Sequence, residues 1–355
     1  MHEKQKAWLK KNLFSLVSIL LMLGILLYFM LTEDGIRNLR HVLFHLQPVW
    51  LLWIAAGVAA GYLLEAFVLH LFCRHLYRKW TYRQSFYVGM VGLFYSALTP
   101  FSMGEPMEVY SMTKMGMDPG SATSIIAIKS LVHHAVTFFY SLVLVAFELD
   151  YFQTKVSNFS FLTIFGLLSN SLFIGAVLLF MLNEKLTTSL LIGVFRILSK
   201  FRLQKFARRS YAKISEQLRI FHVSSRKIGH ADALYGIASA LTLVQVTIAS
   251  LISYFVYRSF SLKGESVFTM VAADTFVTMV ASFIPLPGSS GGAEGGFFLF
   301  FHEFFGKSII PGITLWRIAT YYLNILFGGI VTYCGRKSAF AQDGPEPPGS
   351  GNGAR

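Results

Sequence analysis

Residues 285–294 read PLPGSSGGAE, and this stretch interrupts a run of apolar residues that extends from 267 to 306. An earlier apolar run, 84–118, is interrupted by the stretch TPFSMGEP at 99–106. Each interruption places proline first, then serine and glycine, and finally a glutamate. Because proline and clustered glycine break a helix, we expect both runs to turn back in their middle.

A cation follows each interruption at nearly the same spacing. Lys129 lies 24 residues after Glu105, and Arg317 lies 23 residues after Glu294. Each cation therefore falls about two turns inside the apolar stretch that follows. We interpret the two units as an internal repeat, and a chance similarity between short motifs is the alternative.

The composition indicates an integral membrane protein. The 355 residues are 54% hydrophobic and 14% charged, whereas a soluble domain has roughly 25% charged residues. This composition excludes soluble domains and disordered chains, and the two cysteines, Cys73 and Cys334, are too few for a disulfide scaffold. The net charge of +13 then bears on orientation and on anionic lipid before it bears on nucleic acid.

Six further stretches approach or exceed the ~20 apolar residues that cross a bilayer. They are 12–31, 48–72, 122–148, 159–182, 232–257 and 309–335. The first is too long for the apolar part of a cleaved signal peptide, and no small-residue cleavage site follows it. The predicted fold is an all-α membrane protein with about six transmembrane helices and two re-entrant helical hairpins, 84–118 and 267–306.

The distribution of basic residues predicts the orientation. With both termini on the cytoplasmic side of a cell membrane, most of the 31 Lys and Arg residues lie inside. This arrangement requires the first hairpin to enter from the inside and the second from the outside. Opposed hairpins of this kind form an inverted-topology repeat, which is typical of transporters that bind their substrate near the midplane.

We expect one polytopic domain over 1–340 and a disordered Gly/Pro-rich tail over 341–355. Segment 183–230 contains eleven basic and two acidic residues that alternate with apolar ones. This pattern predicts one or two amphipathic helices on the inner leaflet, and a solvated basic loop is the alternative.

The interruptions are the predicted binding site. Irregular backbone at membrane depth survives only where it is buried in protein or faces water. The N-terminus of each half-helix offers free N–H groups that favour an anion such as phosphate, and an intramembrane cation is a functional candidate by default. The candidate substrate-binding residues are Lys129, Arg317, Glu105, Glu294, Gly104, Ser290, Gly291, Gly292, Tyr321, Asn324 and His133.

A structural role is the alternative for these charges, because each cation can simply pair with Glu105 or Glu294. Two further intramembrane acids, Glu65 and Asp274, can relay protons or pair with a neighbour. No catalytic residue, metal site or cofactor is predicted. The sequence GKS at 306–308 ends like a phosphate-binding loop, but position 301 is Phe rather than the required Gly.

Both motifs resemble those of the lysylphosphatidylglycerol synthase/flippase membrane-domain family. The first is LTP at 98–100 with Gly104-Glu105 and the Lys129 helix; the second is PLPGSSGGAE with RIATYY at 317–322. The resemblance covers roughly residues 10–338 and implies a flippase-like domain. Longer members carry a cytoplasmic aminoacyl-transferase domain that attaches lysine to phosphatidylglycerol. No stretch here is long and polar enough for that domain.

The resemblance and the residues together favour a translocase that moves a phosphate-bearing lipid, such as lysylphosphatidylglycerol, between leaflets. The alternatives are a phosphatidylglycerol lysyltransferase or other membrane-embedded lipid transferase or phosphatase, and a membrane module that recruits a separate synthase. The expected partners are anionic phospholipid or another phosphate-bearing lipid and the membrane, but no nucleic acid. A separate synthase and a homo-oligomer are left open.

Overall fold

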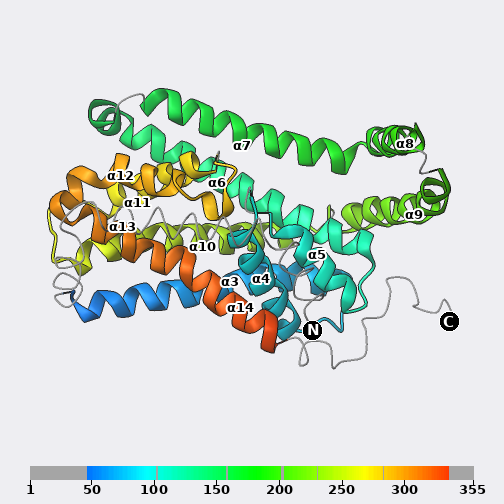
Figure 1. Ribbon diagram of the computed structural model, residues 1–355, viewed down its shortest axis with the longest axis horizontal. Helices are drawn as coiled ribbons and strands as arrows, with labels where there is room; N and C mark the ends of the chain where they lie inside the picture. Colours follow the sequence, from blue (N-terminus) through cyan, green and yellow to red (C-terminus); the bar gives the residue numbers. More distant parts are fainter. Residues whose placement is uncertain are drawn as a thin grey trace, which may run out of the picture.

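The computed structural model describes residues 46–100, 103–156, 159–200, 204–229, 231–282 and 284–335. Within these ranges the secondary structure is helical and contains no strand, as Figure 1 shows. The predicted fold class, all-α, is therefore confirmed for this part of the chain. The predicted first span, 12–31, and the predicted tail, 341–355, lie outside the described residues.

Four of the described helices are long and apolar enough to cross a membrane. They are α3 (Pro48–Leu76), α6 (Pro119–Lys155), α7 (Phe159–Leu182) and α10 (Asp232–Ser259). Each contains one of the predicted spans. Proline in the first turn of α3 and of α6 fits the helix start, because its missing N–H has no partner there anyway.

The last predicted span, 309–335, is helical but not uniform. It consists of α13 (Ile309–Arg317), a π-helical turn η4 (Ile318–Tyr322) and α14 (Leu323–Cys334). A π-helical turn takes one extra residue into the helix, and such turns are frequent at functional sites. Arg317 is the last residue before this turn, which the sequence patterns did not predict.

Each interrupted stretch forms a helical hairpin. The first consists of α4 (Tyr82–Leu98) and α5 (Glu105–Lys114). The second consists of α11 (Val267–Ala281), a 3-10 turn η2 (Pro287–Ser289) and α12 (Gly292–Phe305), which a short turn η3 (Gly306–Ser308) joins to α13. The helices end at the predicted Pro/Gly interruptions.

The two hairpins start from opposite ends of the bundle (Figure 1). The backbone N–H of Gln47 donates to the carbonyl of Ser259 at 2.9 Å, so the start of α3 lies beside the end of α10. Because α4 follows the end of α3 and α11 follows the end of α10, their starting points are opposed. This is the geometry expected of an inverted repeat. That either hairpin is re-entrant in a membrane stays a prediction.

Each hairpin packs into its own apolar core. Aromatic rings dominate the core around α11 and α12, where Phe297 and Phe301 are fully buried and stack at 4.2 Å between ring centroids. Aliphatic and methionine side chains, such as Leu69 and Met112, dominate the core around α4 and α5. By contrast, α7 exposes most of its apolar side chains, which suits a helix that faces lipid.

Segment 183–230 forms two helices, α8 (Glu184–Lys200) and α9 (Gln204–Gly229). The second half of α9 packs against the start of α6 through two buried serine pairs. Ser121 and Ser224 lie 3.0 Å apart at their hydroxyl oxygens, and Ser124 and Ser225 lie 2.8 Å apart. One face of this half of α9 is therefore buried in protein, whereas the position of the segment relative to a membrane stays a prediction.

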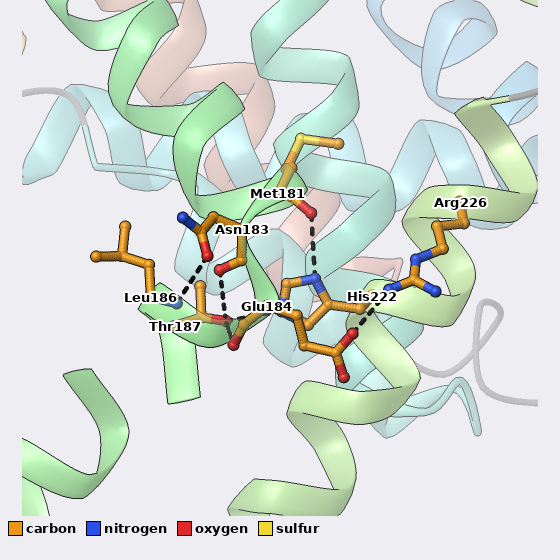
Figure 2. Close-up of polar contacts among 7 residues, drawn as sticks. All are labelled: Met181, Asn183, Glu184, Leu186, Thr187, His222 and Arg226. Atoms are coloured by element: carbon orange, nitrogen blue, oxygen red, sulfur yellow. Dashed lines mark hydrogen bonds and ion pairs between the residues drawn. The ribbon is translucent and has the colours of Figure 1, made fainter. Parts of the chain in front are cut away.

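A buried histidine joins three helices at the corner between α7 and α8, as Figure 2 shows. The ring of His222 on α9 lies 3.1 Å from the carbonyl oxygen of Met181 and 2.8 Å from the hydroxyl of Thr187. Beside it, Arg226 and Glu184 form an exposed ion pair at 2.7 Å. These contacts fix α8 and α9 to the end of α7.

Candidate functional site

The tip of the second hairpin is a tight, glycine-dependent turn. Gly288 and Gly291 have φ angles of +58° and +82°, a region in which residues with a Cβ are strained. A Cβ on Gly292 would overlap the side chain of Ile284. The Ser290 hydroxyl is buried and donates to the carbonyl of Pro287 at 2.6 Å, so this hydroxyl closes the turn.

Arg317 reaches back from α13 to this turn. Its Nε donates to Oε1 of Glu294 at 2.7 Å, and its Nη1 donates to the carbonyl of Gly288 at 3.2 Å. The other carboxylate oxygen of Glu294 accepts the backbone N–H of Gly291 at 2.7 Å. Glu294 therefore caps the start of α12 and also holds the guanidinium in place.

The remaining nitrogen of this guanidinium, Nη2, is buried and has no hydrogen-bond partner within the described chain. The Arg317 side chain is only 4% exposed. Its guanidinium carbon lies 5.3 Å from the ring centroid of Trp316 and 5.2 Å from that of Tyr321, which orients the group. A fixed, buried donor without a partner is costly unless something else accepts its hydrogen bonds.

Lys129 lies at the corresponding place in the first unit, but its surroundings differ. Its ammonium Nζ donates to Glu65 at 2.7 Å and to both carboxylate oxygens of Glu108, at 2.9 and 2.7 Å. The second oxygen of Glu65 accepts from the amide of Gln245 at 2.9 Å. Three helices, α3, α5 and α6, thus meet at one ammonium, and α10 joins them through Glu65.

Two glycines make room for this cluster. A Cβ on Gly92 of α4 would overlap the Glu108 carboxylate, and a Cβ on Gly104 would overlap the Gly92 carbonyl and the Ser96 hydroxyl. The predicted residue Gly104 therefore acts through close packing of α4 against the start of α5. Glycine is the only residue that permits this approach.

The other predicted residues are divided between these two clusters and their surroundings. Tyr321 donates to the carbonyl of Ala97 at 3.0 Å and so ties the π turn to the end of α4, which also contacts η2. Asn324 accepts from the hydroxyl of Tyr62 at 2.8 Å. The contact between α4 and η2 brings the tips of the two hairpins together.

Two predicted residues form no hydrogen bond or ion pair with either cluster in the described part of the chain. Glu105 begins α5 and forms no ion pair with Lys129 in the described chain, since Glu108, one turn later, takes that place. His133 is exposed and packs edge-on against His134. The predicted alternative of a Lys129–Glu105 pair is therefore not what the structure contains, whereas the Arg317–Glu294 pair is present.

The sequence patterns missed Glu108, Gln245 and Gly92. Glu108 lies one turn beyond the glutamate of the motif, and this spacing was the only available signal. Gln245 comes from a different span, and nothing local marks it. Asp274, already noted as an intramembrane acid, is buried and accepts a hydrogen bond from Ser253.

Comparisons with known proteins give two matches that cover most of the chain. Residues 15–328 match the family described as "Lysylphosphatidylglycerol synthase TM region". The chain is 27% identical over 310 residues to a protein of Archaeoglobus fulgidus described as "UPF0104 membrane protein". That match covers 83% of this chain and 90% of the relative. No solved structure matches the chain.

Proposed function

The chain belongs to the family of the lysylphosphatidylglycerol synthase transmembrane region, and from this premise we propose that it moves a phosphate-bearing lipid between membrane leaflets. The substrate class includes lysylphosphatidylglycerol and other phospholipids or polyprenyl-linked glycolipids. The location in this proposal is a cell membrane, with both termini in the cytoplasm.

The observation that supports this proposal most directly is the buried Nη2 of Arg317, which has no hydrogen-bond partner among the described residues. The guanidinium is held by Glu294 and Gly288 through its other two nitrogens, so the free donors have a fixed direction. A phosphate oxygen is a strong acceptor for such a planar donor group. Arg317 is therefore assigned to the lipid headgroup, and Glu294 and Gly288 position it.

The meeting of the two hairpin tips supports transport rather than static binding. The Tyr321–Ala97 hydrogen bond and the contact between α4 and η2 join hairpins that start from opposite ends of the bundle. In inverted repeats, a site between such elements opens to either side as one repeat moves against the other.

The test uses sealed vesicles that contain the reconstituted protein and lysylphosphatidylglycerol. A membrane-impermeant amine reagent reports the fraction of this lipid in the outer leaflet over time. We expect the wild-type protein to speed its movement relative to empty vesicles. Equal rates would contradict the proposal, and hydrolysis of the lipid's phosphodiester to an alcohol and a phosphate monoester would instead favour the enzyme alternative.

The matched variant is Arg317→Lys. A lysine keeps the positive charge next to Glu294 but has no third nitrogen for the headgroup. Because a hydrogen bond to a charged group contributes about 1.5–3 kcal/mol, we expect the rate to fall at least about tenfold. The control is Lys155→Ala, which removes an exposed ion pair with Glu303 and should leave the rate unchanged.

A further inference from the structure

The two clusters, although in corresponding positions, differ in charge. Arg317 faces one carboxylate, Glu294, whereas Lys129 faces two, Glu65 and Glu108. With every group ionised, the Arg317 cluster is neutral and the Lys129 cluster has a net charge of −1. An anionic headgroup is thus disfavoured at Lys129, even though the sequence pattern treats the two cations alike.

The extra negative charge is buried. The side chains of Lys129, Glu65 and Glu108 are 11%, 17% and 5% exposed. Two carboxylates that share one ammonium repel each other, and a buried net charge is unfavourable away from water. Uptake of one positive charge would make the cluster neutral. The simplest such charge is a proton on one of the carboxylates.

Of the two carboxylates, Glu108 is the better proton acceptor. Glu65 has two separate donors, the Lys129 ammonium and the Gln245 amide. Both oxygens of Glu108 accept from the same Nζ of Lys129, and Glu108 is the more buried of the two. Its ionised form is therefore less well satisfied.

We propose that Glu108 is a proton-binding site, protonated in one state of the protein and ionised in another. The site deepens the lipid-translocation function proposed above, because uptake and release of this proton would couple lipid movement to a proton gradient. The proton-binding step itself stands on the geometry of the cluster and does not depend on that function.

A proton fits this site better than a metal cation. The Lys129 ammonium already occupies the position between the carboxylates. Sites for hard metal cations have six or more oxygen ligands for calcium and near-octahedral geometry for magnesium. Among the described residues, no group of three or more His, Cys, Asp or Glu side chains is suited to hold a metal ion.

Protonation has a direct structural consequence. The Glu108–Lys129 ion pair is the charged link between α5 and α6, next to the close contact with Gly92 of α4. A neutral Glu108 loses the charge–charge part of this link, so Lys129 stays with Glu65 on α3. The second helix of the first hairpin is then less strongly held to α6.

The neighbouring groups that influence this titration come from every helix around the site. They are Glu65 and Cys73 on α3, Glu105 on α5, Lys129 and His133 on α6, and Gln245 on α10, while α4 presents Gly92. Lys129 and Glu65 are the closest of the charged groups. Any pH profile must therefore be assigned by substitution.

The experiment records infrared spectra of the purified protein in lipid nanodiscs across a pH series. A protonated carboxyl group absorbs apart from a carboxylate. We expect a buried-carboxyl band that grows as pH falls in the wild-type protein and is lost in Glu108→Gln. The control variant Glu303→Gln changes an exposed carboxylate and should keep the buried-carboxyl band. Asp274 is unchanged in all these variants, so its contribution cancels in the comparison.

A second variant tests the cause. Glu65→Gln leaves Glu108 and Lys129 as a neutral ion pair. Because no second carboxylate then repels the charge on Glu108, Glu108 should stay ionised and the buried-carboxyl band should also be lost. An unchanged band in Glu108→Gln, or in Glu65→Gln if the first variant fails to fold, would overturn the proposal. A carboxyl band that changes with sodium concentration at constant pH, but does not change with pH, would also overturn the proposal.

Coupling is measured separately in the vesicle assay. A gradient of one pH unit should shift the lipid distribution of the wild-type protein by up to about tenfold per transported proton. In Glu108→Gln this response should be absent. If no variant moves lipid while the infrared band behaves as expected, the proton site stands and the proposed transport function fails. A gradient response that survives in Glu108→Gln contradicts the coupling.

Discussion

The Cα of Gly288 lies directly against the ring of Tyr321, so that a Cβ on residue 288 would overlap the ring carbon Cε2. The same glycine has a φ of +58° and presents its carbonyl to Arg317. Tyr321 in turn donates to Ala97 of the first hairpin. One close contact thus connects the tip of the second hairpin, the cation and the tip of the first hairpin.

We expect Gly288→Ala to destabilise the protein. A left-handed conformation costs a residue with a Cβ roughly 1–2 kcal/mol, and displacement of the Tyr321 ring adds to this. The change should lower the thermal unfolding midpoint, measured by tryptophan fluorescence in detergent. Lipid movement should fall as well, since the Gly288 carbonyl holds Arg317.

Gly295→Ala is the control for that substitution. Gly295 lies in α12, and a Cβ there would meet no atom within 4 Å. Because alanine is favoured over glycine inside a helix by about 0.5–1 kcal/mol, this variant should be as stable as the wild-type protein or more stable. If the two variants unfold at the same temperature, Gly288 is not packed against Tyr321 as described.

Removal of the Lys129 side chain tests how strongly the first cluster depends on its cation. Lys129→Ala strands two buried carboxylates, and loss of one partner of a buried pair costs about 3–5 kcal/mol. Addition of Glu65→Gln and Glu108→Gln should recover much of this loss. Lys155→Ala breaks an exposed pair of the same length, and such pairs contribute about 0–1 kcal/mol. Equal unfolding midpoints for Lys129→Ala and Lys155→Ala would contradict the claim that Lys129 compensates two buried carboxylates.

The sequence was most informative where the relevant contacts are local in the chain. Proline and glycine fixed the hairpin tips, and the Arg317–Glu294 pair lies within one hairpin and the helix that follows it. The charge partners of Lys129 could not be chosen in this way. The choice between Glu105 and Glu108 depends on the rotation of α5, and Gln245 reaches the cluster only through tertiary packing.

The π turn after Arg317 illustrates a second limit. Tyr321 and Asn324 follow Arg317 by four and seven residues, and in a regular α-helix this spacing places all three on one face. Tyr321 does lie beside Arg317, but Asn324 contacts Tyr62 of α3 and the carbonyl of Thr320. Extra residues in a helix arise from packing, and periodicity alone does not reveal them.

Cysteine labelling tests the topology. Lys155 ends α6, and Lys205 lies at the start of α9, in the basic segment predicted to be cytoplasmic. Single cysteines at these positions should react with an impermeant reagent from opposite sides of the membrane. The background is Cys334→Ser, since Cys334 is exposed, and Cys73 is buried. Reaction of both positions from one side would rule out the predicted orientation and the inverted repeat in the membrane.

His222 should be the residue that fastens the α8–α9 pair to α7. The carbonyl of Met181 can only accept, so Nδ1 donates to it, and in the neutral ring Nε2 accepts from Thr187 (Figure 2). His222→Ala leaves both partners without the ring, and a buried group left unsatisfied costs about 1–3 kcal/mol. Amide hydrogen exchange should therefore increase at the end of α7 and in α8. The start of α6 should change less, because the two serine pairs with α9 remain.

Arg226→Ala, which breaks only the adjacent exposed pair, should leave exchange in α8 nearly unaltered. If the two variants alter exchange equally, the histidine has no special part in this junction.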